Sequence, residues 1–266
     1  MKKAPKSLND WVNGLQRVGS YTFTREKALY ELAVEAGTLE KALQRLNTQG
    51  RILRLRKRFY VIVPLEYQST GTIPAEWFID ELMKYIGKPY YVGCLSAAAL
   101  YGAAHQRPQE MQVVVPDHVR MVDKEVVRIR FLRFAGMSGA LTQLHRTHTG
   151  DYPVSTPEWT AIDLIRFQKH YGSMDAAASV LTELGEVLAA ERLAVAARCE
   201  SRSAYLQRLG WMLDFLGFKT LTGPLQAGLE GRNPSYVPLN ASLKQRSGIR
   251  DKRWRIVVNE QPERSL

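Results

Sequence analysis

The sequence predicts an α+β protein of two domains, and three observations carry this prediction. Residues 1–66 contain helical periodicities that end in a basic, strand-like segment. Residues 90–167 alternate short strands with helices, which indicates a mixed sheet. Residues 175–217 are mostly helical. We therefore expect a small N-terminal domain over residues 1–66, a linker over 67–75 and an α+β domain with a helical rear half over 76–266.

Three short helices are expected in the N-terminal domain. Ser7 begins the first, with Asp10 at the reciprocal capping position and apolar side chains at helical spacing. Thr24 can cap a second helix, whose apolar face consists of Ala28, Leu29, Leu32 and Ala33. Gly37 is expected to form the turn before a third helix, which Thr38 can cap and which ends at Gly50.

A basic β-hairpin is expected directly after the third helix. The segment 52–63 has strand character, and Arg51, Arg54, Arg56, Lys57 and Arg58 interrupt its apolar positions. Five cations in eight residues repel one another unless a polyanion neutralises them. The alternative to a hairpin that binds a polyanion is a solvated hairpin edge, which is kept basic to prevent pairing with other chains.

The order of these elements predicts a winged helix-turn-helix that binds DNA, with a protein-binding winged helix as the alternative. Net charge supports DNA: the whole chain carries +11, and residues 1–70 hold 13 Lys+Arg against 6 Asp+Glu, a net +7. On the third helix Lys41, Gln44, Arg45 and Thr48 form one stripe, in which Gln44 and Arg45 are the candidate base readers. The full set of candidate DNA-binding residues is Thr24, Arg25, Lys27, Thr38, Lys41, Gln44, Arg45, Thr48, Arg54, Arg56, Lys57 and Arg58.

The rest of the chain is expected to start with a helix over residues 76–86. Strands are predicted over 90–92, 111–115, 126–134 and 144–149, with a helix over 96–101 between the first two. Thr156 and Pro157 open a further helix, as cap and first residue. Helices follow over 174–184, 186–197 and 203–216, and extended segments are expected around 236–239 and 255–258.

Three sequence patterns resemble the AbiEi family of antitoxins and transcriptional regulators, from bacterial abortive-infection type IV toxin–antitoxin systems. The first is the pattern from Leu39 to Tyr60, which is generic to winged helices. The second is LSAAALYG at 95–102, followed by Gln106-Arg107-Pro108 and the strand into Pro116. The third is VSTPEWTAIDL at 154–164. The last two are more specific in this order and spacing, and the similarity covers nearly the whole chain.

The resemblance implies a function for each domain. The winged helix would bind inverted repeats of double-stranded DNA in its own promoter and repress its operon, and the C-terminal domain would serve as the antitoxin. The toxin would be nucleotidyltransferase-like and would be countered without a stable protein complex. A regulator whose second domain senses a small molecule is the alternative reading.

Catalysis has little support in the sequence. No Asp-x-Asp pair, P-loop or Gly-x-Gly-x-x-Gly motif occurs, so we expect neither an enzyme nor a cofactor. His145 and His148 lie three apart in a predicted strand or turn, on opposite faces, so no metal site is expected. Glu158, Asp163 and Arg166 are the best catalytic candidates, although a structural role fits them better: Glu158 suits its helix N-terminus, and Asp163 or Thr160 could tie the helix to a strand. Ser96 is similarly expected to be a cap.

Three further features concern surface charge, the two cysteines and the cellular compartment. A possible secondary basic surface comprises Arg128, Arg130, Lys244, Arg246, Arg250, Lys252 and Arg253, although a solvated surface is the simpler reading. Cys94 and Cys199 are expected to be buried free thiols, with a disulfide as the less usual alternative. Neither a signal peptide nor a long apolar run is visible, so we expect a cytoplasmic protein without a membrane partner.

Overall fold

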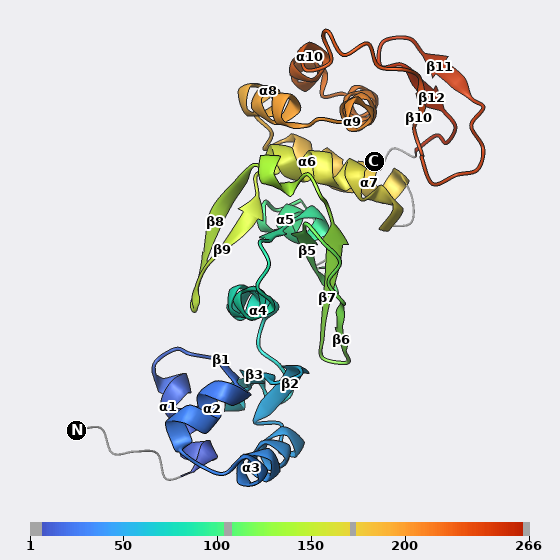
Figure 1. Cartoon of the computed structure of the whole chain (residues 1–266). Helices are drawn as coiled ribbons and strands as arrows, with labels where there is room; N and C mark the ends of the chain where they lie inside the picture. Colours follow the sequence, from blue (N-terminus) through green and yellow to red (C-terminus); the bar gives the residue numbers. More distant parts are fainter. Residues whose placement is uncertain (1–6, 104–107, 171–173, 263–266) are drawn as a thin grey trace. The chain divides into compact units, whose positions relative to one another are not determined.

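A computed structural model describes residues 7–103, 108–170 and 174–262 (Figure 1). The chain divides into two compact units. The first contains Met1–Tyr90, His118–Phe131 and Leu144–Tyr152, and the second contains Tyr91–Asp117, Leu132–Gln143 and Pro153–Leu266. His105 and the Gln106-Arg107 pair of the second family pattern lie outside the described residues.

Three helices form the N-terminal part of the first unit, as predicted: α1 (Leu8–Arg17), α2 (Arg25–Leu32) and α3 (Ala36–Thr48). The Ser7 side chain accepts a hydrogen bond from the Asp10 amide, which confirms Ser7 as the cap, and the Ser7 hydroxyl also donates to the Asp10 carboxylate. Thr24 caps α2 by accepting a hydrogen bond from the Lys27 amide. The apolar faces of these helices pack on a core that includes Trp11, Phe23, Leu39, Leu43, Ile52, Tyr60 and Ile62.

A three-stranded sheet completes this part, with β2 (Ile52–Arg56) and β3 (Phe59–Ile62) forming the expected hairpin. Lys57 and Arg58 form its turn, in which Arg58 has a φ of 64°. The short strand β1 (Thr22–Thr24) was not predicted; it pairs antiparallel with β3, so the strand order is β1-β3-β2. Because β1 has only three residues, its own sequence carries no periodicity that could reveal it.

The turn between α2 and α3 differs from the sequence prediction. Ala33 ends α2 in the left-handed conformation, with a φ of 50°, and is exposed rather than part of the apolar face. Glu35 occupies the cap position of α3 without a side-chain hydrogen bond. The helix therefore begins about one turn earlier than expected and contains Gly37 and Thr38, so the predicted roles of Gly37 as a turn and Thr38 as a cap are wrong.

The segment after β3 contains two short 3₁₀ helices, η1 (Leu65–Tyr67) and η2 (Ala75–Trp77), and then α4 (Ile79–Ile86), three residues later than predicted. The Trp77 ring packs against Tyr21 and His148, at centroid distances of 5.3 Å in both cases. The Thr149 hydroxyl donates to the Trp77 carbonyl at 2.7 Å. Residues from the middle of the chain thus complete the first unit.

A six-stranded mixed sheet follows in the order β6-β7-β5-β4-β9-β8. Its strands are β4 (Tyr91–Val92), β5 (Met111–Val115), β6 (Val122–Lys124), β7 (Val127–Arg133), β8 (Thr142–Thr147) and β9 (Gly150–Ser155). β4 pairs antiparallel with β5 and parallel with β9, which confirms the mixed character. β6 and β9 were not predicted.

The second unit is dominated by helices, as expected from the sequence. They are α5 (Cys94–Leu100), α6 (Pro157–Arg166), α7 (Met174–Gly185), α8 (Ala190–Cys199), α9 (Ser203–Leu216) and the unpredicted α10 (Lys219–Ala227). Short 3₁₀ turns occur at η3 (Met137–Gly139) and η4 (Gln168–His170). Thr156 caps α6, with Pro157 as its first residue, as predicted. Ser96 lies inside α5 and accepts a hydrogen bond from the Gln112 amide, so it is not the predicted cap.

The C-terminal segment forms a small sheet of β10 (Val237–Pro238), β11 (Ile249–Asp251) and β12 (Ile256–Val258), in the order β10-β12-β11. Trp254 anchors this segment on α9. A Cβ atom at Gly210 would lie 2.2 Å from the Trp254 ring, so only glycine allows this close packing. The Trp254 indole also donates to the Asp214 carboxylate.

Candidate nucleic-acid interface

Helix α3 presents a continuous polar face to solvent. Leu39, Leu43 and Leu46 are buried on the inner side. The predicted stripe lies on the outer side, where Lys41, Gln44, Arg45 and Thr48 are all exposed, as is Thr38 in the first turn. No hydrogen bond or ion pair within the described residues engages the side chains of Lys41, Gln44 or Arg45, so they are available to a ligand.

The β2–β3 hairpin divides its cations between two environments. Arg54 and Lys57 are exposed, and Arg58 forms an ion pair with Glu26 at 3.3 Å. Arg56 points elsewhere: its guanidinium donates to the Arg120 carbonyl and lies 5.7 Å from the centre of the Phe131 ring. Burial, together with the nearby Arg120 charge, lowers the pKa of Arg56. Arg51 is likewise engaged, with Asn13 at 2.8 Å.

The start of α2 lies next to α3. Arg25 forms an ion pair with Glu40 at 3.4 Å, and its amide donates to the Arg58 carbonyl at 2.9 Å. Lys27 is exposed, and its backbone amide is occupied by the Thr24 cap. Arg25 is therefore tied to both α3 and the hairpin turn, whereas Thr24 acts as the cap of α2 and Lys27 is exposed.

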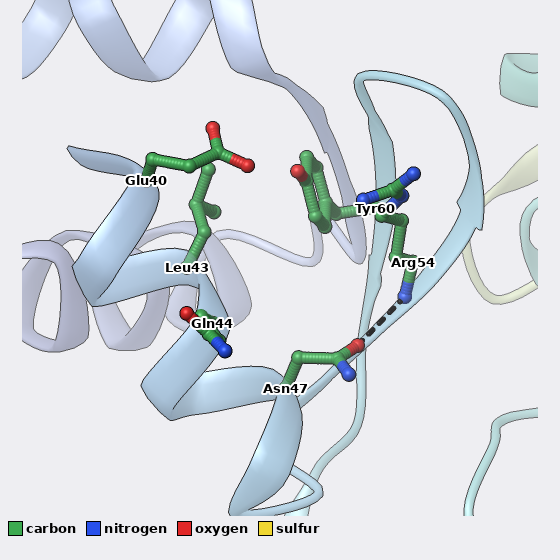
Figure 2. A pocket seen from close by; sticks show the side chains of 6 residues that line it. All are labelled: Glu40, Leu43, Gln44, Asn47, Arg54 and Tyr60. Atoms are coloured by element: carbon green, nitrogen blue, oxygen red, sulfur yellow. Dashed lines mark hydrogen bonds between the residues drawn. The ribbon is translucent and has the colours of Figure 1, made fainter. Parts of the chain in front are cut away.

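A hollow of about 220 Å³ lies between α3 and the hairpin (Figure 2). It is lined by Glu40, Leu43, Gln44, Asn47, Arg54 and Tyr60. The Asn47 side chain accepts a hydrogen bond from the Arg54 amide at 3.1 Å, which fixes strand β2 against the helix. Burial, followed by the Glu40 charge, raises the pKa of Tyr60. Sequence reasoning assigned Gln44 and Arg54 to binding but missed Glu40, Asn47 and Tyr60, because their convergence depends on how the hairpin folds back.

The possible secondary basic residues do not form one free cationic surface. Arg128 is paired with Asp123 at 3.3 Å, and Arg253 is held by Asp214, Thr222 and Gln226. Arg250 lies over the Tyr236 ring, and Arg246 donates to the Ala241 carbonyl. Lys244 and Lys252 are exposed, and Arg130 is partly buried and engaged.

The candidate catalytic group has a structural arrangement. Asp163 is buried and accepts a hydrogen bond from the Tyr91 hydroxyl of β4 at 2.9 Å, which confirms the expected tie between helix and strand. Arg166 bridges Asp163 and Glu200, and its guanidinium lies 3.9 Å from the centre of the Phe134 ring. Burial raises the pKa of Asp163 to about 6, although Arg166 acts in the opposite direction. Sequence reasoning missed Tyr91 and Glu200, which lie far from α6 along the chain and join this group only through the fold.

Glu158 and Thr160 also act within the fold. The Thr160 hydroxyl pairs with Ser155 at the end of β9, at 2.7 Å, which is the second expected tie to a strand. Glu158 lies in the first turn of α6, as expected, and its carboxylate also accepts from the Ala189 amide and Arg192 at the start of α8. The buried polar groups of α6 are therefore engaged by neighbouring elements.

No group of three or more potential metal ligands occurs among residues 7–103, 108–170 and 174–262. His145 packs against Tyr152 and His148 against Trp77, so the two rings have separate aromatic partners.

Cys94 is buried as expected, whereas Cys199 is exposed, which corrects that prediction; both are free thiols. None of the helices in the described regions is long and apolar enough to cross a membrane.

Comparison with protein families identifies a domain within the chain. Residues 91–215 match the model of the AbiEi antitoxin C-terminal domain. The chain carries an AbiEi antitoxin domain. This AbiEi domain begins at the first residue of the second unit and contains the whole α6 network around Asp163. It supports an antitoxin role in a toxin–antitoxin system.

Solved structures extend the comparison beyond the AbiEi domain. The RV2827C protein from Mycobacterium tuberculosis matches with a TM-score of 0.65 and 17% identity, over 96% of this chain and 92% of that one. An antigenic nucleotidyltransferase-like protein from Paracoccidioides brasiliensis has a TM-score of 0.37 and 12% identity, over 57% of this chain and 91% of that one. The first match shows a shared fold, whereas the TM-score of 0.37 is too low to show one. No curated protein matches the chain.

Proposed function

We propose that the chain is a type IV antitoxin that also binds DNA and represses its own operon. In this proposal residues 7–63 act as a winged helix-turn-helix, with α3 as the recognition helix and the β2–β3 hairpin as the wing. The observation that carries the DNA-binding part is the unengaged polar face of α3 beside the exposed cations of the hairpin. The AbiEi domain supports the antitoxin part. The protein would act in the cytoplasm, without a cofactor or catalytic activity.

Phosphate contacts and base contacts would come from different residues. Lys41, Arg54 and Lys57 are exposed cations that suit phosphate, with Lys27 adding charge near the start of α2. Gln44 and Arg45 point away from the core in the middle of α3, where their amide and guanidinium groups match adenine and guanine edges. The DNA would carry inverted repeats, as the family resemblance implies.

The test is binding to the DNA just upstream of the protein's own gene, compared with random DNA across a salt series. We expect a preference of about a thousandfold for the upstream DNA, with affinity falling steeply as salt rises. Equal affinity for both DNAs would contradict site-specific repression. A growth assay with the nucleotidyltransferase-like toxin that the family resemblance implies, expressed with and without this chain, tests the antitoxin part separately.

Arg56 provides a prediction that separates folding from DNA binding. Arg56→Met removes the contacts with Arg120 and Phe131, so we expect the free energy of unfolding to fall by roughly 1–3 kcal/mol. The salt dependence of DNA binding should stay unchanged, because this guanidinium faces the protein. Urea unfolding and the salt series measure the two effects. The matched variant Lys57→Met alters an exposed cation at the turn and should show the opposite pattern.

A further inference from the structure

The hollow between α3 and the hairpin carries a chemical pattern that phosphate binding does not explain. Its polar groups come from three elements: Glu40 and Gln44 from α3, Arg54 from β2 and Tyr60 from β3. Within the described parts of the chain, the Gln44 amide, the Arg54 guanidinium and the Tyr60 hydroxyl form no hydrogen bond. The hollow therefore presents several polar groups that a ligand can satisfy.

Glu40 is the unusual member of this set, because a carboxylate repels DNA phosphates. Its side chain is 56% exposed, and one oxygen, Oε2, contacts Arg25 at 3.4 Å. The other oxygen, Oε1, has no hydrogen-bond partner among the residues that the structure describes. Figure 2 shows the Glu40 carboxylate and the Tyr60 hydroxyl pointing toward one another across the hollow. The Arg25 charge offsets part of the repulsion and leaves Oε1 available.

A carboxylate only accepts hydrogen bonds, so its partner must donate. In the major groove of DNA, the donors are the exocyclic amino groups of cytosine and adenine. Glu40 also lies one helical turn before Gln44, on the same side of α3, which is the part of a recognition helix that meets base edges. A phosphate contact is excluded for this group by its charge.

We propose that Glu40 is a specificity-determining residue that selects a cytosine or adenine amino group, with the hollow receiving the edge of that base. This inference rests on the proposed DNA-binding function and adds a base contact to it. Tyr60 is a positioning neighbour, because its hydroxyl can donate to an acceptor beside the amino group. Asn47 holds β2 against α3 and so preserves the width of the hollow.

The experiment is selection of duplexes from a random DNA library, followed by sequencing, with the full-length wild-type protein and three variants. Glu40→Gln keeps the shape of the side chain and removes its charge. We expect wild type to prefer cytosine or adenine at one position by about tenfold, and Glu40→Gln to lose that preference. Its affinity for random DNA should rise by a factor of about 2–5, because one repulsive charge is gone.

Glu35→Gln is the matched control, since it removes the same charge at the cap of the same helix but outside the hollow. It should raise affinity for random DNA without changing the selected sequence. Tyr60→Phe keeps the ring that stacks on Phe23 at 5.1 Å, and should weaken the preference at the same position or the adjacent one.

Each outcome has a distinct meaning. If wild type selects a sequence and Glu40→Gln selects the same one with the same strength, the role of Glu40 is overturned while DNA binding stands. If Glu35→Gln alters the selected sequence as much as Glu40→Gln does, the effect belongs to charge rather than to the hollow, and the inference also falls. If wild type selects no sequence, site-specific DNA binding itself is contradicted.

Discussion

Arg166→Met should destabilise the AbiEi domain by about 3–5 kcal/mol. The substitution leaves the carboxylates of Asp163 and Glu200 buried without their shared cation, and both are at most 1% exposed. It also removes the guanidinium from the face of the Phe134 ring. Chemical unfolding followed by circular dichroism measures the change.

Arg198→Met is the matched control for this substitution. Arg198 lies on α8, is exposed, and has no ion pair within the described residues. We expect its effect to stay within about 0.5 kcal/mol. Equal stability of Arg166→Met and wild type would show that the buried cation contributes nothing to the fold.

The same variant should show a characteristic pH dependence. Burial raises the pKa of Asp163 from 3.8 to about 6 in the folded protein, so the folded state binds this proton more tightly than the unfolded state. Its contribution to stability is therefore complete below pH 3.8 and is lost as the pH rises through about 6. Arg166 opposes that rise in pKa, so removing it moves the pKa of Asp163 further upward.

The stability deficit of Arg166→Met should consequently be larger above pH 6 than near pH 4, where Asp163 is protonated in both proteins. Unfolding experiments across this range measure the trend. When both proteins carry Asp163→Asn, the deficit caused by Arg166→Met should no longer change over this range, because no titrating group then remains at that position. A deficit that grows toward acid would contradict this account.

Replacing Lys41, Arg45 and Lys57 together with glutamine should reduce affinity for the upstream DNA by about a hundredfold near physiological salt. All three side chains are exposed and unpaired in the described structure. Each one that contacts a phosphate releases about one counterion, so the slope of log affinity against log salt should become shallower by about 0.9 per contact. Fluorescence anisotropy at several salt concentrations measures both quantities.

A triple variant of Lys169, Arg198 and Lys219 provides the charge-matched control. These cations are exposed and belong to the second unit. The control loses the same net charge, so it reveals any effect of overall electrostatics. If it weakens binding as much as the first triple variant does, the α3 and hairpin residues are not the DNA contacts.

Gln44→Ala should instead change the preferred base at one position, with about 1–3 kcal/mol of discrimination lost.

Elements with strong local signals were predictable from the sequence. Helix α9 and strand β5 have the predicted bounds, because sustained apolar periodicity marks the first and Pro116 stops the second. Strand β1 was missed because it exists only through pairing with β3. Helix α10 was missed because Gly223 and Pro224 interrupt its helical pattern.

The candidate site was predictable only in part, for a related reason. Helical spacing was sufficient to bring Lys41, Gln44, Arg45 and Thr48 to one exposed face. On the hairpin, alternation alone could not tell which cations face solvent. The partner of Arg56 lies 64 residues away, and the hollow forms from three elements, so neither could be inferred from local spacing.

The composition of the first unit has a consequence for how this gene can be divided. The residues 118–131 and 144–152 fall within the AbiEi match, yet they belong to the same compact unit as the N-terminal helices and hairpin. A fragment that stops at residue 90 lacks the Arg120 carbonyl that holds Arg56 and the Thr149 and His148 side chains that cover Trp77. Recombination that joined the first ninety residues to another protein would therefore transfer an incomplete structure. The two halves are expected to be inherited as one piece.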